Sequence, residues 1–274
     1  MVVFSFAAVA TAVALFAHSA VAVPSPSFDS NGIYAKREAS CDFPKPSKTI
    51  SLDAAMSVTG TFDGDLVRYD RGEGACKGQK EGGKVAAVFV LQPGATIRNV
   101  VIGAHQSEGI HCMGPCNIYN VWFEDVCEDA ITLKQTSGTT NISGGGAKNA
   151  SDKVIQHNGG GTVNIESFCV INFGKLYRSC GNCKTQFKRV VNISHVIAQN
   201  GKALVGVNAG DLAKIATSTN SYKDVESICS TFQSASSGNE PKMLASNKHS
   251  SRQFSLFETL DVVVDLGVEW VGKS

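Results

Sequence analysis

The stretch Cys116-Asn117-Ile118-Tyr119-Asn120-Val121-Trp122 decides the fold, because related units return along the chain at a nearly regular distance. The other units are Ala95–Ile102, Thr139–Ser143, Val163–Glu166 and Val191–Val196. Their isoleucines lie at positions 97, 118, 142, 165 and 193, so the steps are 21, 24, 23 and 28 residues. A loose repeat of roughly 20 to 30 residues is typical of a solenoid in which each coil buries its apolar side chains against the next.

The sequence around these units is rich in short β-branched runs. From Ile50 onward such runs are separated by Gly, Asn and Ser, and helical periodicity is hard to find. We therefore predict an all-β chain that folds as a right-handed parallel β-helix in a single domain, with a sandwich or barrel as the alternative. Asparagines at matching positions of stacked coils are expected to form hydrogen-bonded ladders. The runs Gly144–Gly146 and Gly159–Gly161 are expected at tight corners of the solenoid.

Composition divides the chain into four parts. Residues 1–22 are apolar and end in Ala20-Val21-Ala22, which predicts a secretory signal peptide with its cleavage site. Residues 23–40 are polar and form a possible pro-segment or linker. The β-helix is expected over residues 41–230, and residues 231–274 are expected to be a linker and an atypical tail. No second apolar segment is long enough to span a membrane.

Secretion changes the interpretation of the nine cysteines, because an oxidising compartment favours disulfides. Nine is an odd number, so at least one cysteine stays free or pairs between chains. The alternative is a zinc site, since Cys112 with Cys116 and Cys180 with Cys183 have the spacing of zinc ligands. The pairing itself stays open at the level of sequence.

The net charge of +1 excludes a strongly basic protein that binds nucleic acid through its overall charge. An anionic partner must therefore be met by a local cluster of cations. The stretch Gly174–Cys183 contains such a cluster, because Lys175 and Arg178 lie three residues apart. In an extended strand this spacing puts the two side chains on opposite faces, so a bend near Leu176 or Tyr177 is needed to bring both to one site.

Four motifs in order together resemble the family 3 pectate lyases of microbial plant pathogens. They are Glu108-Gly109-Ile110-His111-Cys112, Val121-Trp122-Phe123-Glu124-Asp125-Val126-Cys127-Glu128-Asp129-Ala130, Asp152-Lys153-Val154-Ile155-Gln156-His157-Asn158-Gly159, and Gly174–Cys183. The resemblance covers roughly residues 43–208. It implies a compact parallel β-helix that cleaves de-esterified pectin, or polygalacturonate, by calcium-dependent β-elimination.

The acidic residues of these motifs suit the chemistry that the resemblance implies. The proton on C5 of the sugar is acidic only when the charge of the neighbouring carboxylate is neutralised, and Ca²⁺ held by oxygen ligands can do this. Glu128 and Asp129 are adjacent, and Glu108 lies 20 residues before Glu128, close to one coil. We predict these three as the metal ligands, and Glu124 and Asp125 as structural residues.

The resemblance points to Arg178 as the base that removes the C5 proton. Nearby positive charges would favour its neutral form. Lys175 is the rival base, in which case Arg178 would bind a carboxylate. Lys153 and Lys175 are expected to bind the substrate carboxylate and the developing enolate, and His157 is expected to be a buried framework residue.

The chain departs from the family pattern at its ends. Residues 84–89 lack an acidic residue expected before the strand, and Val205–Asp211 is expected to form a shortened final coil. The tail, residues 254–271, is interpreted either as a strand that caps the solenoid or as a stretch foreign to the fold.

The predicted function is therefore that of a secreted, extracellular pectate lyase with a role in plant cell wall degradation and virulence. The partner is polygalacturonate, and a monomer is expected. One alternative is a catalytically inactive β-helix that only binds cell-wall polysaccharide. A pectin hydrolase is a further alternative, which would require a carboxylate pair acting as acid and base around a water molecule.

Overall fold

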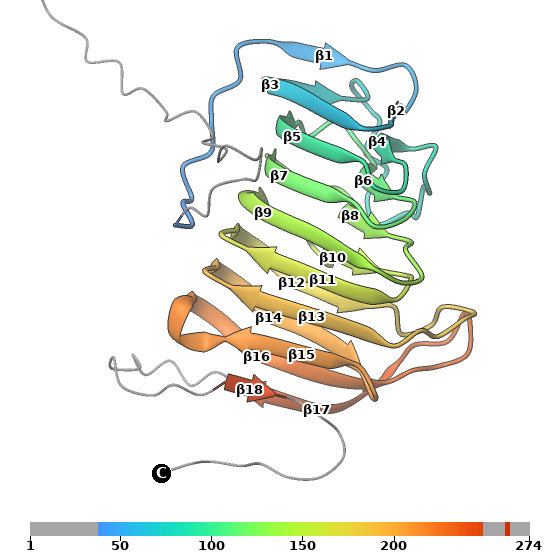
Figure 1. Cartoon of the computed structure of the whole chain (residues 1–274), viewed down its shortest axis with the longest axis vertical. Helices are drawn as coiled ribbons and strands as arrows, with labels where there is room; N and C mark the ends of the chain where they lie inside the picture. The colour runs from blue at the N-terminus through green and yellow to red at the C-terminus, as the bar shows by residue number, and fades with distance from the viewer. Residues whose placement is uncertain (1–37, 249–260, 264–274) are drawn as a thin grey trace, which may run out of the picture.

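The computed structural model describes residues 38–248 and 261–263, and nearly all of their regular structure is β-strand. The predicted signal peptide and most of the segment 23–40 lie outside the described residues. The chain winds as a parallel β-solenoid, with coil stacked on coil from β1 at one end to β16 at the other (Figure 1). The predicted parallel β-helix is confirmed, and the sandwich or barrel alternative is wrong.

Each coil contributes strands to three columns, which we call the ladder face, the back face and the charged face. The ladder face contains the first parts of β3 (Thr61–Asp70), β5 (Thr96–Ile102), β7 (Asn117–Phe123) and β9 (Thr139–Lys148), followed by β11 (Gly161–Glu166), β13 (Arg189–Ser194) and β15 (Leu212–Ala216). The back face contains β1 (Thr49–Ser51), the remaining parts of β3, β5, β7 and β9, and the first parts of β12 (Cys169–Ser179), β14 (Ile197–Asn208) and β16 (Ser221–Gln233).

The charged face contains β2 (Met56–Val58), β4 (Ala87–Leu91), β6 (Glu108–Cys112), β8 (Asp129–Leu133), β10 (Lys153–His157) and the remaining parts of β12, β14 and β16. Neighbouring strands within these three columns run parallel, because each coil returns to the same face after one turn. This face carries the four motifs singled out in the sequence.

The repeat seen in the sequence is a repeat in space. Its isoleucines pair in register from coil to coil and are all buried: Ile97, Ile118, Ile142, Ile165 and Ile193. The residues one position earlier form the predicted ladder, in which the Nδ2 of Asn141, Asn164 and Asn192 donates to the asparagine Oδ1 of the coil before at 2.8 to 2.9 Å. The first amide, Asn117 Nδ2, donates to Thr96 Oγ1 at 3.3 Å. Buried isoleucines thus hold the coils together, and asparagines set their register on the outside.

Glycines allow the backbone to turn where coils approach closely. Gly145 has φ +93°, and a Cβ at this position would overlap the carbonyl oxygen of Val121 in the coil below. Gly161 has φ +88° at the corner between β10 and β11. Both predicted corners are confirmed: Gly159–Gly161 precedes β11, and Gly144–Gly146 lies where the continuous strand β9 turns from the ladder face to the back face.

The C-terminal coils continue beyond the point expected from the sequence. The prediction of a shortened final coil at Val205–Asp211 is wrong, because β15, the short 3₁₀ helix η1 (Thr217–Thr219) and β16 follow it. β16 extends to Gln233, past the predicted boundary at residue 230. β17 (Lys242–Lys248) then pairs antiparallel with β16, and within the tail β18 (Asp261–Val263) pairs antiparallel with β15. The open edges of the last strands are thereby covered.

Disulfides join parts of the chain that are near and far apart. The pairs are Cys41–Cys169, Cys76–Cys127, Cys112–Cys116 and Cys180–Cys183. The zinc alternative is wrong, because each candidate ligand pair is already closed as a disulfide. Cys229 is free and buried. Over residues 38–248 and 261–263, no helix has the length and apolar character to cross a bilayer.

Candidate active site

Four ionisable residues form a column along the charged face. The strand register stacks Glu108, Asp129, Lys153 and Lys175 at one position of four successive coils. The first three begin their strands β6, β8 and β10, so the column follows the edge where the chain enters this face. Two acidic levels are thus followed by two basic levels, and the predicted proximity of Glu108 to Asp129 is confirmed.

Glu108 is fixed at the acidic end of the column. It is fully buried, its Oε1 accepts hydrogen bonds from the backbone N–H groups of Gly82 and Gly83 at 2.9 and 3.1 Å, and its Oε2 lies 2.9 Å from His111 Nε2. Burial by itself raises the pKa of Glu108, but the hydrogen bonds from His111 and Gly82 outweigh burial and lower it. Glu108 is therefore held as a carboxylate in a single orientation.

Glu128 and Asp129 bring two more carboxyl groups to the same place. Burial raises the pKa of Asp129 well above its usual range, and burial also raises the pKa of Glu128. The positive charge of Lys153 opposes both shifts, while Glu108 adds to them. Glu128 Oε2 and Asp129 Oδ1 are buried without a hydrogen-bond partner, although Lys153 Nζ is 3.4 Å from Asp129 Oδ1. The positive charge of Lys153 is therefore not enough to offset the burial of the Glu128 and Asp129 carboxylates.

Glu81 is a fourth acidic residue, which was not predicted. It lies in the loop before β4, and one carboxylate oxygen each of Glu81, Glu108 and Glu128 lie within 4.8 Å of one another. The resemblance predicts an acidic residue within 84–89, and Glu81 lies three residues before that range. Its setting, Gln79-Lys80-Glu81-Gly82-Gly83, is that of an ordinary solvated loop, so no pattern of residues marked it as a ligand.

These carboxylates fit a bound Ca²⁺ ion. Ca²⁺ takes oxygen ligands, mainly carboxylates, in a flexible geometry. Glu81, Glu108 and Glu128 supply such oxygens within 4.8 Å of one another, and Asp129 follows Glu128 in register with Glu108. One oxygen each of Glu128 and Asp129 is buried without a hydrogen-bond partner. A cation at this position would also offset the unfavourable burial of Glu128 and Asp129.

Lys153 and Lys175 share one counter-ion on the basic side of the column. Lys153 Nζ is 2.6 Å from Asp152 Oδ2, and Lys175 Nζ is 3.2 Å from Asp152 Oδ1. Burial by itself lowers the pKa of Lys153, but Asp129 and Asp152 outweigh it, so the pKa is raised. Asp152 was part of a quoted motif but was not predicted as a site residue. It holds the two ammonium groups side by side.

Arg178 and Lys175 meet although they lie three residues apart in β12. Leu176 and Tyr177, which lie between them, are both fully buried. A Cβ at Gly206 would lie 2.9 Å from Arg178 Cδ and 3.4 Å from Lys175 Cδ, so both side chains cross the same glycine. The predicted approach of Lys175 and Arg178 to one site is confirmed, and Gly206 provides the space for both side chains.

Arg178 lies in an unusual environment for an arginine. Its side chain is almost fully buried, and its guanidinium lies 4.0 Å above the ring of Phe232. Burial lowers the pKa of Arg178 to about 10, and the charge of Arg189 acts in the same direction, against the opposing effects of Asp152 and Asp211. Arg178 is thus the cation of this site whose protonated form is disfavoured by its surroundings.

The two histidines in the motifs have structural partners. His157 Nε2 donates to the carbonyl oxygen of Gly160 at 3.1 Å, so its Nδ1 accepts from the hydroxyl of Tyr177 at 2.7 Å. Burial lowers the pKa of His157 to about 4, which keeps it neutral. The framework role predicted for His157 is confirmed.

The structural role of Glu124 is also confirmed, because it accepts two hydrogen bonds from Arg68 at 2.6 and 2.8 Å.

Comparisons with known proteins agree with this arrangement. The family model described as "Pectate lyase" matches residues 40–239. The chain is 53% identical over 210 residues to "Probable pectate lyase E" of Neosartorya fischeri, covering 75% of this chain and 81% of that protein. It is 50% identical over 229 residues to "Pectate lyase E" of Emericella nidulans, covering 81% of this chain and 89% of that protein.

Solved structures lead to the same family. The catalytic domain of pectate lyase PelI from Erwinia chrysanthemi superposes with a TM-score of 0.57 at 28% identity, over 75% of this chain and 92% of that one. PelI in complex with tetragalacturonic acid gives a TM-score of 0.56 at 28% identity, over 76% of this chain and 66% of that one. Given its solenoid fold, its charged column and these relatives, the chain belongs to the pectate lyase family and has the function of a pectate lyase.

Proposed function

We propose that the chain cleaves de-esterified polygalacturonate by calcium-dependent β-elimination at the charged face, and that it is a secreted enzyme of the family 3 type that acts as a monomer. The observation that carries the proposal is the column of stacked acids and lysines with the buried Arg178 beside it. A polymer with a carboxylate on each sugar can be bound by the two basic levels directly and by the two acidic levels through a cation. The complex of PelI with tetragalacturonic acid supports the choice of substrate.

The proposed metal ligands are Glu108, Glu128 and Asp129, with Glu81 added. When bound there, Ca²⁺ would neutralise the carboxylate of the substrate and so acidify the proton on C5. Lys153 and Lys175 bind a substrate carboxylate and stabilise the negative charge that develops as the proton leaves. Asp152 keeps the two ammonium groups oriented toward the substrate.

Arg178 is the proposed base. In its neutral form it takes the proton from C5, the electron pair forms a double bond between C4 and C5, and the bond from C4 to the glycosidic oxygen breaks. The product therefore carries an unsaturated uronate. The rival base, Lys175, forms an ion pair with Asp152 at 3.2 Å, whereas the hydrogen-bond acceptors found for Arg178 within residues 38–248 are neutral oxygens. This contrast favours Arg178.

The test is ultraviolet absorbance during incubation of the purified protein with polygalacturonate at mildly alkaline pH, with calcium and with a chelator. We expect absorbance from the unsaturated uronate to rise only with calcium, and to be lost in Arg178→Ala. Reducing ends without absorbance would mean that the enzyme is a hydrolase. No product from a folded protein would mean that it is an inactive binder.

A further inference from the structure

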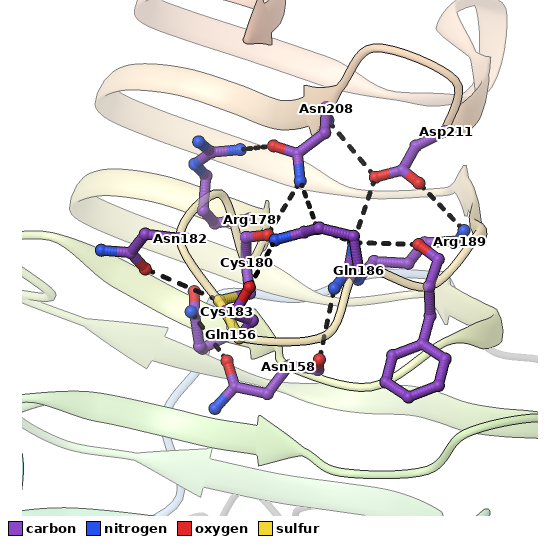
Figure 2. The surroundings of a disulfide bond; sticks show 11 residues. Gln156, Asn158, Arg178, Cys180, Asn182, Cys183, Gln186, Arg189, Asn208 and Asp211 are labelled. Atoms are coloured by element: carbon purple, nitrogen blue, oxygen red, sulfur yellow. Dashed lines mark hydrogen bonds and ion pairs between the residues drawn. A yellow bond between two sulfur atoms is a disulfide. The ribbon is translucent and has the colours of Figure 1, made fainter. Parts of the chain in front are cut away.

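Beside Arg178, a buried amide connects several parts of the charged face. Asn208 ends β14 and is only 3% exposed, and Figure 2 shows it between Arg178 and the loop closed by Cys180–Cys183. Its Oδ1 accepts a hydrogen bond from Arg178 Nη1 at 3.1 Å, and its Nδ2 donates to the carbonyl oxygen of Cys180 at 2.8 Å. The protonated guanidinium of Arg178 can only donate and the carbonyl can only accept, so these partners fix the orientation of the amide.

The backbone of Asn208 is held as firmly as its side chain. Its N–H donates to Asp211 Oδ2 at 3.3 Å, and Asp211 Oδ1 accepts from the backbone N–H of Arg189 at 3.0 Å. Gln186 Oε1 lies 3.3 Å from Asn208 Nδ2 and accepts a second hydrogen bond from Arg189 (Figure 2). Asn208 thus sits in a network that links β13, β14 and the disulfide loop.

We propose that Asn208 is the positioning residue for the base, holding the guanidinium of Arg178 with a neutral acceptor so that it can lose its proton. This inference rests on the proposed function. A primary amide meets both requirements at this position, because it offers an oxygen to Arg178 and an N–H to Cys180. A carboxylate in its place would hold Arg178 as a permanent ion pair and would face the carbonyl of Cys180 with a second acceptor.

Ionisable groups on several elements raise or lower the pKa of Arg178, so the charge of the group that accepts its hydrogen bond also affects its protonation. Those that act on it are Asp152 before β10, Tyr177 in β12, Arg189 in β13 and Asp211 after β14. A further negative charge in direct hydrogen-bond contact would add to the effects of Asp152 and Asp211. It would therefore favour the protonated form of Arg178, in which the guanidinium cannot act as a base.

Two substitutions at Asn208 separate charge from orientation. For Asn208→Asp we expect the ascending, alkaline limb of the kcat–pH profile to move to higher pH by about one unit or more. For Asn208→Ala we expect kcat to fall by about 10²-fold at every pH while KM changes less than about twofold, because the base is no longer oriented. Asn208→Ser replaces the alanine variant if that protein does not fold, as judged by circular dichroism.

Asn200→Asp is the matched control, since it adds the same charge at an exposed position of the same strand, β14, eight residues before Asn208. Its profile is expected to match the wild type. If the folded Asn208 variants keep the wild-type kcat–pH profile and kcat, the role of Asn208 is overturned while the proposed function stands. Activity retained by Arg178→Ala would overturn the proposed base and the role of Asn208 together.

Discussion

A single carboxylate, Asp152, neutralises two lysines and also faces the proposed base. Burial by itself raises the pKa of Asp152, but its hydrogen bonds and charge interactions with Lys153 and Lys175 outweigh this and lower it. The negative charge of Asp152 in turn favours the protonated form of Arg178. Asp152 therefore orders the two lysines but decreases the fraction of Arg178 that is neutral, and so able to accept a proton, at neutral pH.

This leads to a prediction for Asp152→Asn. Removal of the charge lowers the pKa of Arg178, so the neutral base is populated at lower pH, and the ascending limb of the kcat–pH profile should move down by up to about one pH unit. The profile is measured by ultraviolet absorbance with polygalacturonate at saturating calcium. Asp224→Asn, at an exposed position of β16, should leave the profile unchanged. A shift to higher pH would contradict the assignment.

Glu81 provides a second prediction for a single residue. It is exposed, yet its carboxylate lies with those of Glu108 and Glu128, so Glu81→Gln should weaken calcium binding by about tenfold or more. Isothermal titration calorimetry with calcium alone measures this without reliance on activity. Glu73→Gln, exposed in the same loop, is the control and should bind calcium as the wild type does. Equal affinities in both variants would remove Glu81 from the site.

At the scale of elements, the pair His157 and Tyr177 connects β10 to β12 beneath the lysines. His157 is fully buried and neutral, and Tyr177 is buried beside it, with ring centroids 5.9 Å apart. Because the pKa of His157 is lowered to about 4 in the folded protein, the unfolded chain binds more protons between about pH 4 and 6.5. This contribution to stability is complete above pH 6.5 and is lost as the pH falls through this window.

We therefore expect the free energy of unfolding to decrease from pH 6.5 to pH 4, with His157 contributing on the order of 3 kcal/mol. His157→Gln can keep both hydrogen bonds without titrating, so its free energy of unfolding should depend less on pH in this range. Urea denaturation at several pH values measures the difference. His105→Gln, at an exposed site, should keep the wild-type dependence, and the same slope in both variants would argue against the role of His157.

At the scale of the whole molecule, the segment before β1 is fastened across the back face of the solenoid (Figure 1). The disulfide Cys41–Cys169 joins residues 128 positions apart. The ring of Phe43 packs against that of Trp122 with 4.8 Å between centroids, and Lys148 Nζ lies 3.7 Å from the centroid of the Phe43 ring. The N-terminal segment thus ties several coils together. In a solenoid, where contacts are mainly between neighbouring coils, such a long connection is an additional source of cooperativity.

Replacing both Cys41 and Cys169 by serine should lower the free energy of unfolding by about 3 to 5 kcal/mol, because a long loop is no longer closed in the unfolded chain. Urea denaturation of the purified protein measures this. The double serine variant of Cys112 and Cys116, which are only four residues apart, should lose less. Equal losses would show that loop length does not govern these disulfides.

The sequence by itself determined the repeat and hence the solenoid, because buried isoleucines and outer asparagines must recur once per coil whatever the turns between them. It also determined the stacking of Glu108, Asp129, Lys153 and Lys175, since their spacing is that of the coils. The disulfides followed from the number and setting of the cysteines, but their pairing did not. The spacing of residues along the chain shows which of them stack at the same position of successive coils. It does not show which side chains come into contact through the loops.

Only the tertiary structure brought in Glu81, Asp152 and Asn208. Glu81 reaches the site from a loop, and Asn208 reaches it from β14, which stacks on β12 one coil further along the chain. The structure also decided the environment of Arg178. Its lowered pKa arises from burial and from charges on other coils, and its orientation arises from an amide 30 residues away. Burial and through-space charge are properties of the folded molecule, which no local pattern of residues encodes.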